Sequence, residues 1–242
     1  MMLFVNVGWG QVTIVSENMG TPSGTTTIAS NVFQNSALTF TGSVDLRKTT
    51  PSDTYSAASG NGNVWFASGT KEFQISGVNT STFSSLSLEF GVLASNVNNM
   101  LIVEVSANGI DYTALAVNST IAANKWALKT ATGTIPSTEN LRIRFSKNNT
   151  FSFRLDDVKL TGVILNTAPV VSNVSITGLP NTTVELTGSY DYTDTESDAD
   201  ASTYKWYTAT DDSGTDVTAI VGATDVNFTL TATELGKYIR FG

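Results

Sequence analysis

The side chains that could do chemistry in this chain are carboxylates, hydroxyls, amides and aromatic rings. The 242 residues contain no cysteine and no histidine. Disulfides, thiolate or imidazole catalysis and the usual zinc ligands are therefore excluded. What remains is catalysis by paired carboxylates and oxygen ligation of calcium-like ions. No spacing marks two acids as a facing catalytic pair, and we expect no enzyme; the acids considered are Glu72, Glu89, Glu104 and Asp111.

The densest acidic group lies between residues 191 and 202, in the sequence DYTDTESDADAS. Its spacing is reminiscent of calcium loops, but the glycine that an EF-hand loop requires is missing. A charge run of this kind is usually a solvated loop. We interpret it as such a loop, with calcium binding as the alternative.

Aromatic rings near turns or loop ends are the other functional resource of the first 163 residues. Sugar-binding proteins stack pyranose faces on such rings, whereas large aromatic residues elsewhere are usually buried in a core. Burial in the core is therefore the alternative for each ring, and Trp206 is interpreted as a core residue. The candidate ligand-binding residues are Trp65, Trp126, Tyr55 and Tyr112.

The clearest structural pattern covers residues 141–162, LRIRFSKNNTFSFRLDDVKLTG. Apolar residues alternate with arginines in residues 141–145, and the alternation resumes after the turn-rich residues 147–150. This pattern predicts a β-hairpin with one buried face. The apolar residues change parity at Asp156 and Asp157, which predicts a bulge or strand end with one aspartate turned inward.

Short alternating segments separated by turns fill the rest of the first 163 residues. An Asn108-Gly109 pair is typical of a hairpin turn. About nine or ten such strands predict an all-β sandwich or jelly roll. No apolar run approaches the roughly 20 residues of a membrane span.

Charge divides the chain into two parts. Residues 1–166 contain ten acids and ten bases, whereas residues 167–242 contain eleven acids and three bases, so the second part carries the whole net charge of −8. This asymmetry indicates two domains. Neither part is basic enough to favour nucleic-acid binding.

The first eleven residues, MMLFVNVGWGQ, look like the end of a secretory signal peptide without its basic start. The alternative is a first β-strand. A secreted chain without cysteine fits bacterial export. We therefore expect a secreted or cell-surface protein.

Three motifs in order resemble the jelly-roll modules of bacterial carbohydrate-active and adhesive proteins, including galactose-binding-like and carbohydrate-binding modules. They are Glu17-Asn18-x-Gly20, VSANGIDYTAL at residues 105–115 and FRLDDVKLTG at residues 153–162. The resemblance covers residues 12–163. It implies a structural calcium ion between the first and last strands, with Glu17 and Asp156 or Asp157 as ligands. The middle motif often has tryptophan where this chain has Tyr112.

Residues 164–169 read as a linker, and residues 170–242 resemble a bacterial immunoglobulin-like domain. Trp206 stands at the place of the core tryptophan, and Leu230, Glu234, Gly236 and Tyr238 resemble a tyrosine corner. The chain stops at Gly242, where the last strand of such a fold would begin. We therefore expect a C-terminally incomplete domain and further domains in a longer protein.

These observations predict a jelly-roll sandwich followed by an incomplete immunoglobulin-like sandwich. The function we expect is non-catalytic binding of an extracellular polysaccharide by an accessory module. One alternative is a structural spacer or adhesion module without a sugar site. Another is an appendage of a secreted hydrolase or nuclease whose catalytic domain lies outside this chain.

Overall fold

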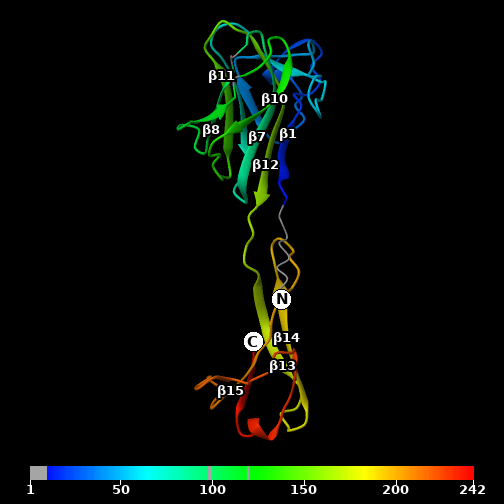
Figure 1. Cartoon of the computed structure of the whole chain (residues 1–242), viewed down its shortest axis with the longest axis vertical. Coiled ribbons are helices and arrows are strands. Elements are labelled where there is room, and N and C mark those ends of the chain that lie inside the picture. The colour runs from blue at the N-terminus through cyan, green and yellow to red at the C-terminus, as the bar shows by residue number, and fades with distance from the viewer. Residues whose placement is uncertain (1–9, 98–99, 119) are drawn as a thin grey trace. The chain divides into compact units, whose positions relative to one another are not determined.

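The computed structural model describes residues 10–97, 100–118 and 120–242. The chain divides into two compact units, Met1–Leu165 and Asn166–Gly242, and this boundary lies inside the predicted linker. The predicted signal-peptide remnant, residues 1–11, falls almost wholly outside the described residues. Each unit is built of antiparallel strands, shown in Figure 1.

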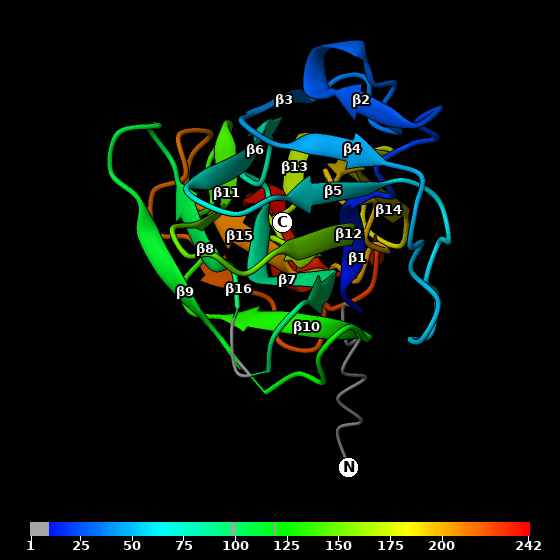
Figure 2. The ribbon, with the colours of Figure 1, turned by 90° about the horizontal axis from the view of Figure 1, so that it is seen from above.

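The first unit is a sandwich of two strand layers. Figure 2 shows the first layer with β4, β5, β12, β7 and β10 in this order. The second layer contains β8, β11, β6 and β3, and β9 pairs with both β10 and β8, so it joins the two layers. The all-β sandwich prediction is confirmed. The strands are β1 (Val12–Glu17), β2 (Thr25–Thr27), β3 (Thr39–Gly42), β4 (Asp45–Arg47), β5 (Asn63–Phe66), β6 (Lys71–Val78), β7 (Phe83–Ala94), β8 (Ile102–Ser106), β9 (Thr113–Val117), β10 (Trp126–Thr132), β11 (Leu141–Lys147) and β12 (Phe153–Ile164), with one 3-10 turn, η1 (Ile28–Ser30).

The core lies between the two layers and follows from the alternation of each strand. Phe90 of β7 and Phe145 of β11 come from opposite layers, and their ring centroids lie 5.1 Å apart in an edge-to-face contact. Both side chains are fully buried. Burial of one large apolar side chain stabilises the fold by about 1.5–3 kcal/mol. Because one face of each strand is buried in this way, the opposite face of each strand is free to carry polar side chains.

The predicted hairpin of residues 141–162 is wrong. β11 pairs with β6 and β8 in one layer, whereas β12 pairs with β1, β5 and β7 in the other. Both strands have one apolar face because they cover the same core from opposite sides. Alternation shows that a face is buried but not which strand lies alongside.

The predicted bulge in β12 is confirmed. The register between β12 and β7 shifts between Asp156 and Lys159, and Asp157 has a φ of 48°, in the left-handed region. The bulge leaves Leu155 and Val158 buried on either side of the two aspartates. It therefore changes the direction in which the carboxylates point.

The second unit has two three-stranded sheets. Their strand orders are β13–β14–β17 and β16–β15–β18. Trp206 is fully buried, and its indole Nε1 donates a hydrogen bond to the Asp225 carbonyl oxygen at 2.9 Å, so the predicted core role is confirmed. The elements are β13 (Val170–Thr177), β14 (Glu185–Thr193), β15 (Trp206–Ala209), β16 (Thr218–Ala219), β17 (Asn227–Thr229), η2 (Ala232–Glu234) and β18 (Tyr238–Phe241).

The resemblance to a tyrosine corner does not extend to its hydrogen bond. Tyr238 is 50% exposed, and its hydroxyl forms no hydrogen bond with the described residues. Glu234 instead forms a capping box with Thr231 at the start of η2. In the described part of the chain, no helix has the length and apolar character needed to cross a membrane.

Candidate functional site

Glu17, at the end of β1, is a buried anchor for the loop that follows. Its carboxylate accepts hydrogen bonds from the backbone N–H groups of Met19, Gln34 and Asn35 and from the Asn35 side-chain amide, at 2.9–3.1 Å. A buried carboxylate is stabilised when N–H donors satisfy both of its oxygens. Glu17 therefore ties the segment of residues 18–35, which includes β2 and η1, to the first strand.

Asp156 and Asp157 lie under a different loop, residues 51–62. The Asp157 carboxylate accepts hydrogen bonds from the Tyr55 hydroxyl at 2.5 Å, the Ser52 hydroxyl at 3.1 Å and the Ser59 backbone N–H at 3.1 Å. Asp156 is fully buried and accepts a hydrogen bond from the Asp157 N–H at 2.8 Å. The two aspartates therefore hold this loop against the bulge of β12.

The environment of these groups changes their pKa values. Burial, reinforced by the neighbouring charge of Asp157, raises the pKa of Asp156 from 3.8 to about 8. Burial and the hydrogen bond to Asp157 also raise the pKa of Tyr55. The buried Asp156 carboxyl group therefore holds its proton to a higher pH than an exposed aspartate does.

Glu17 and the two aspartates do not form one cluster. Glu17 pairs in register with Val158, which is buried in the core, whereas Asp156 pairs with Gly91 under the loop of residues 51–62. Among the described residues no group of three or more acidic side chains is placed to hold a metal ion. Calcium binding by Glu17 with Asp156 or Asp157 therefore stays a prediction.

The acidic segment of residues 191–202, for which calcium binding was the predicted alternative, has the local geometry of a turn around Asp194. Asp194 Oδ1 accepts the backbone N–H groups of Glu196 and Asp198, and Asp200 accepts the Tyr190 hydroxyl. Glu196 also accepts hydrogen bonds from Thr167, whereas Asp194 Oδ2 is buried without a hydrogen-bond partner among the described residues. The solvated loop and the calcium alternative both stay predictions.

Two of the four candidate aromatic residues stabilise the loop of residues 51–62. Trp126 is only 5% exposed, and its carbonyl oxygen accepts a hydrogen bond from the Thr54 hydroxyl at 2.7 Å. Tyr55 lies 6.5 Å from Trp126 between ring centroids and packs over Gly91, where any Cβ would overlap the phenol. In this conformation Trp126 has no ring face available to a ligand, and the Tyr55 hydroxyl is engaged by Asp157.

Trp65 lies on the outer side of the first layer, since its neighbours Val64 and Phe66 are buried in the core. The Arg154 guanidinium lies 4.5 Å from the ring centroid and that of Arg47 lies 6.0 Å from it. Trp65 is therefore a partly buried ring flanked by two cations. This face of the sandwich is separate from the one that carries Tyr112.

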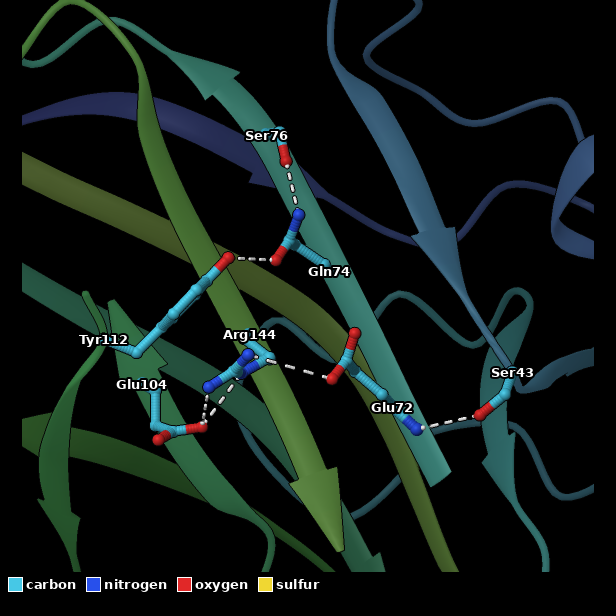
Figure 3. Close-up of polar contacts among 7 residues, drawn as sticks. All are labelled: Ser43, Glu72, Gln74, Ser76, Glu104, Tyr112 and Arg144. Atoms are coloured by element: carbon cyan, nitrogen blue, oxygen red, sulfur yellow. Dashed lines mark hydrogen bonds and ion pairs between the residues drawn. The ribbon is translucent and has the colours of Figure 1, made fainter. Parts of the chain in front are cut away.

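The outer face of the second layer carries a row of polar residues in register. Arg144 of β11 lies opposite Gln74 of β6 on one side and Glu104 of β8 on the other. Arg144 Nε and Nη2 both contact Glu104 Oε2 at 2.9 Å, and Nη1 lies 3.9 Å from Glu72 Oε2. Figure 3 shows Arg144 between the two carboxylates. The guanidinium is thus fixed in place by acids from both neighbouring strands.

Tyr112 is held over this row, and we call Tyr112 with Gln74, Arg144, Glu104 and Glu72 the tyrosine face. The Arg144 Cζ atom lies 3.6 Å from the centre of the Tyr112 ring, and the Tyr112 hydroxyl donates to Gln74 Oε1 at 2.5 Å (Figure 3). Gln74 Nε2 in turn donates to the Ser76 hydroxyl at 3.0 Å. The ring is partly exposed, and Arg144 covers one of its faces. The remaining exposed surface of Tyr112 is therefore presented to solvent in a fixed orientation.

The sequence made Tyr112 a candidate and named Glu72 and Glu104 only as isolated acids, and it did not connect them with Gln74 or Arg144. Glu72, Gln74, Glu104 and Arg144 alternate with buried residues in their strands, so their outward orientation could be predicted. Their assembly into one row could not, because it depends on the pairing of β11 with β6 and β8. The signal available in the sequence was the alternation of charged residues with core residues in three separate strands.

The tyrosine face combines a fixed aromatic ring with hydrogen-bonding groups around it. Such a surface can bind an amphipathic ligand that has an apolar face and a polar edge. Each of its two acids lies within 4 Å of Arg144.

The sequence matches no protein-family model and no curated protein. Its fold is similar to that of several solved structures. A CBM61 module solved with β-1,4-galactotriose is 18% identical, with 52% of this chain and 88% of that chain covered and a TM-score of 0.37. The cleaved K3 adhesin domain of Lys-gingipain from Porphyromonas gingivalis is 19% identical. The match covers 63% of this chain and 99% of that domain, with a TM-score of 0.39. The xylan-binding CBM22-1 domain from Paenibacillus barcinonensis is 13% identical. The match covers 65% of this chain and 98% of that domain, with a TM-score of 0.39. Similarities this low carry no argument about a ligand.

Proposed function

We propose that this chain is a non-catalytic module that attaches a larger secreted protein to an extracellular glycan, and that the tyrosine face is its binding surface. The observation that carries the proposal is the Tyr112 ring, fixed by Arg144 at 3.6 Å and by Gln74 at 2.5 Å. A ring already held in place loses little conformational entropy when a ligand covers it.

The chemistry of a sugar matches this surface. A pyranose ring has a face of C–H groups and a rim of hydroxyls. The aromatic ring suits the C–H face, while the carboxylates of Glu72 and Glu104 suit hydroxyl donors. Thr39 and Thr41 of β3 are exposed in register with Ser76 and Gln74. The polar surface therefore extends across β3, β6, β11 and β8, which suits an extended polysaccharide chain.

The second unit suits a spacer. Its two three-stranded sheets enclose Trp206, as expected for an immunoglobulin-like domain. It carries the chain's net charge of −8, which favours a solvated surface over a sugar site. The proposal also includes that the second unit is an immunoglobulin-like domain and that the parent protein is secreted.

The proposal is tested by affinity electrophoresis of the whole chain in gels that contain soluble neutral polysaccharides such as xylan, galactan and mixed-linkage glucan. We expect at least one of them to retard the wild-type protein. Tyr112→Ala should lose the retardation. Tyr238→Ala, which removes a half-exposed tyrosine in the second unit, is the matched control and should keep it.

Absence of retardation by every glycan, in protein shown by circular dichroism to be folded, contradicts the proposal. That outcome favours the structural spacer. Retardation that survives Tyr112→Ala but is lost in Trp65→Ala places the binding surface on the first layer instead.

A further inference from the structure

We propose that the tyrosine face selects uncharged glycans and excludes those that carry carboxylate or sulfate groups. This inference rests on the proposed function, because it names the ligand class of the same surface. The argument comes from the state of the charged groups on the outer face of β8, β11 and β6.

The cationic group that contacts Tyr112 is already engaged. Arg144 directs Nε and Nη2 to Glu104, and its Nη1 approaches Glu72. One flat side of the guanidinium lies against the Tyr112 ring. Arg142 directs Nη1 to the carbonyl oxygens of Ala107 and Asn140, both at 3.4 Å. A uronate or sulfate is recognised best by a guanidinium that can offer two parallel N–H donors. The Nε–Nη2 side of Arg144 could offer this pair only by releasing Glu104, and its Nη1 atom lies 3.9 Å from a second carboxylate, Glu72.

The acidic groups keep unused acceptor capacity. Within the described residues, neither Glu104 Oε1 nor Glu72 Oε1 accepts a hydrogen bond, and the Glu72 side chain is 46% exposed. An ionised carboxylate can only accept hydrogen bonds. The hydroxyl groups of a neutral sugar are donors and suit these oxygens. A carboxylate or sulfate on the ligand would instead face two like charges.

The net charge around the tyrosine face also disfavours a negatively charged glycan. The tyrosine face has two acids, Glu72 and Glu104, and one base, Arg144, and the neighbouring outward residue Arg142 brings the sum to zero. The outward-facing residues of β6, β8 and β11 therefore present no excess of positive charge to attract a polyanion. At longer range, the chain as a whole carries −8 and repels one.

The test compares polysaccharides that share a backbone and differ in charge. The pairs are hydroxyethylcellulose with carboxymethylcellulose, methyl-esterified with de-esterified homogalacturonan, and unsubstituted xylan with glucuronoxylan. The whole chain is run by affinity electrophoresis at low salt and at 300 mM NaCl. We expect retardation by a neutral member, at least tenfold weaker retention by its charged partner, and little effect of salt on the neutral member.

A double variant reports on the cause of the selectivity. Glu72→Gln with Glu104→Gln removes both acids and frees Arg144, and it should gain several-fold affinity for the charged member. Glu89→Gln, on β7 of the other layer, is the matched control and should change nothing.

The outcomes separate the inference from the proposed function. Equal or stronger retention of the charged member overturns the neutral selectivity and leaves glycan binding in place. A folded double variant that still binds the neutral glycan but gains nothing for the charged one also overturns it. If no member of any pair is retained, the inference and the proposed function both fail.

Discussion

Three basic residues of β11 show how position within a strand decides what a side chain does. Arg142 and Arg144 point outward to the polar face, whereas Lys147 has the inward parity of Leu141, Ile143 and Phe145 and is 2% exposed. Its Nζ donates to the carbonyl oxygens of Ala67, Gly69 and Asn149 at 2.6–2.9 Å. Burial lowers the pKa of this lysine. Lys147 therefore joins two loops at the edge of the core.

Replacement of Lys147 by methionine should destabilise the first unit by about 2–4 kcal/mol, because three carbonyl oxygens lose their common donor. Urea unfolding followed by tryptophan fluorescence measures the change. Lys159→Met, at an exposed position of β12, is the control and should stay within about 0.5 kcal/mol of wild type. Equal stabilities of the two variants would show that the buried ammonium group contributes nothing.

At the scale of elements, the loop of residues 51–62 depends on the bulge of β12. The bulge places Asp156 and Asp157 under the loop, where Ser52, Tyr55 and Ser59 contact them. A protonated Asp156 avoids repulsion from Asp157. The attachment of the loop is therefore expected to weaken as Asp156 ionises.

The stability of the first unit should fall as the pH rises. The pKa of Asp156 is about 8 in the folded chain and ordinarily 3.8, so between these values the folded state holds a proton that the unfolded state has released. The free energy of unfolding then decreases by up to about 1.4 kcal/mol for each pH unit from pH 4 to pH 8 and levels off above pH 8. Denaturant titrations across this range measure it.

In Asp156→Asn, the fall in the free energy of unfolding that comes from Asp156 should disappear. Asp53→Asn changes an exposed position in the loop of residues 51–62 and should keep the wild-type fall. Identical pH profiles for wild type and Asp156→Asn would show that Asp156 ionises normally.

Much of the first unit's element structure could be predicted from alternation. The bulge at Asp156 and the turn at Asn108-Gly109, which joins β8 to β9, were both predicted correctly. The pairing of β11 with β12 was not, because two strands that cover one core from opposite layers have the same pattern as a hairpin. The sequence made Tyr112 a candidate but did not place Arg144 beside it, because their contact depends on long-range strand pairing.

At the scale of the whole molecule, charge is distributed unevenly between the two units. The first unit has ten acids and ten bases, and the second has eleven acids and three bases. Self-repulsion destabilises a compact unit with a large net charge, and salt screens it. The two units should therefore respond differently to ionic strength.

The second unit should become more stable between 10 and 300 mM NaCl, while the first unit changes little. Trp206 lies in the core of the second unit, so a Trp65→Phe, Trp126→Phe variant reports mainly on that unit, and Trp206→Phe reports on the first. Thermal unfolding followed by fluorescence measures both. A salt response of the same size in both units would contradict this account of the charge distribution.

The most direct test of the central claim is the affinity of the tyrosine face for the glycan that retards the wild-type protein, measured by isothermal titration calorimetry. Tyr112→Phe keeps the ring over Arg144 and loses only the bond to Gln74, so it should bind within a few-fold of wild type. Tyr112→Ala should lose at least about 2 kcal/mol of binding free energy, or roughly thirtyfold in affinity. Unchanged affinity in folded Tyr112→Ala would show that the glycan binds elsewhere and would contradict the assignment of this face.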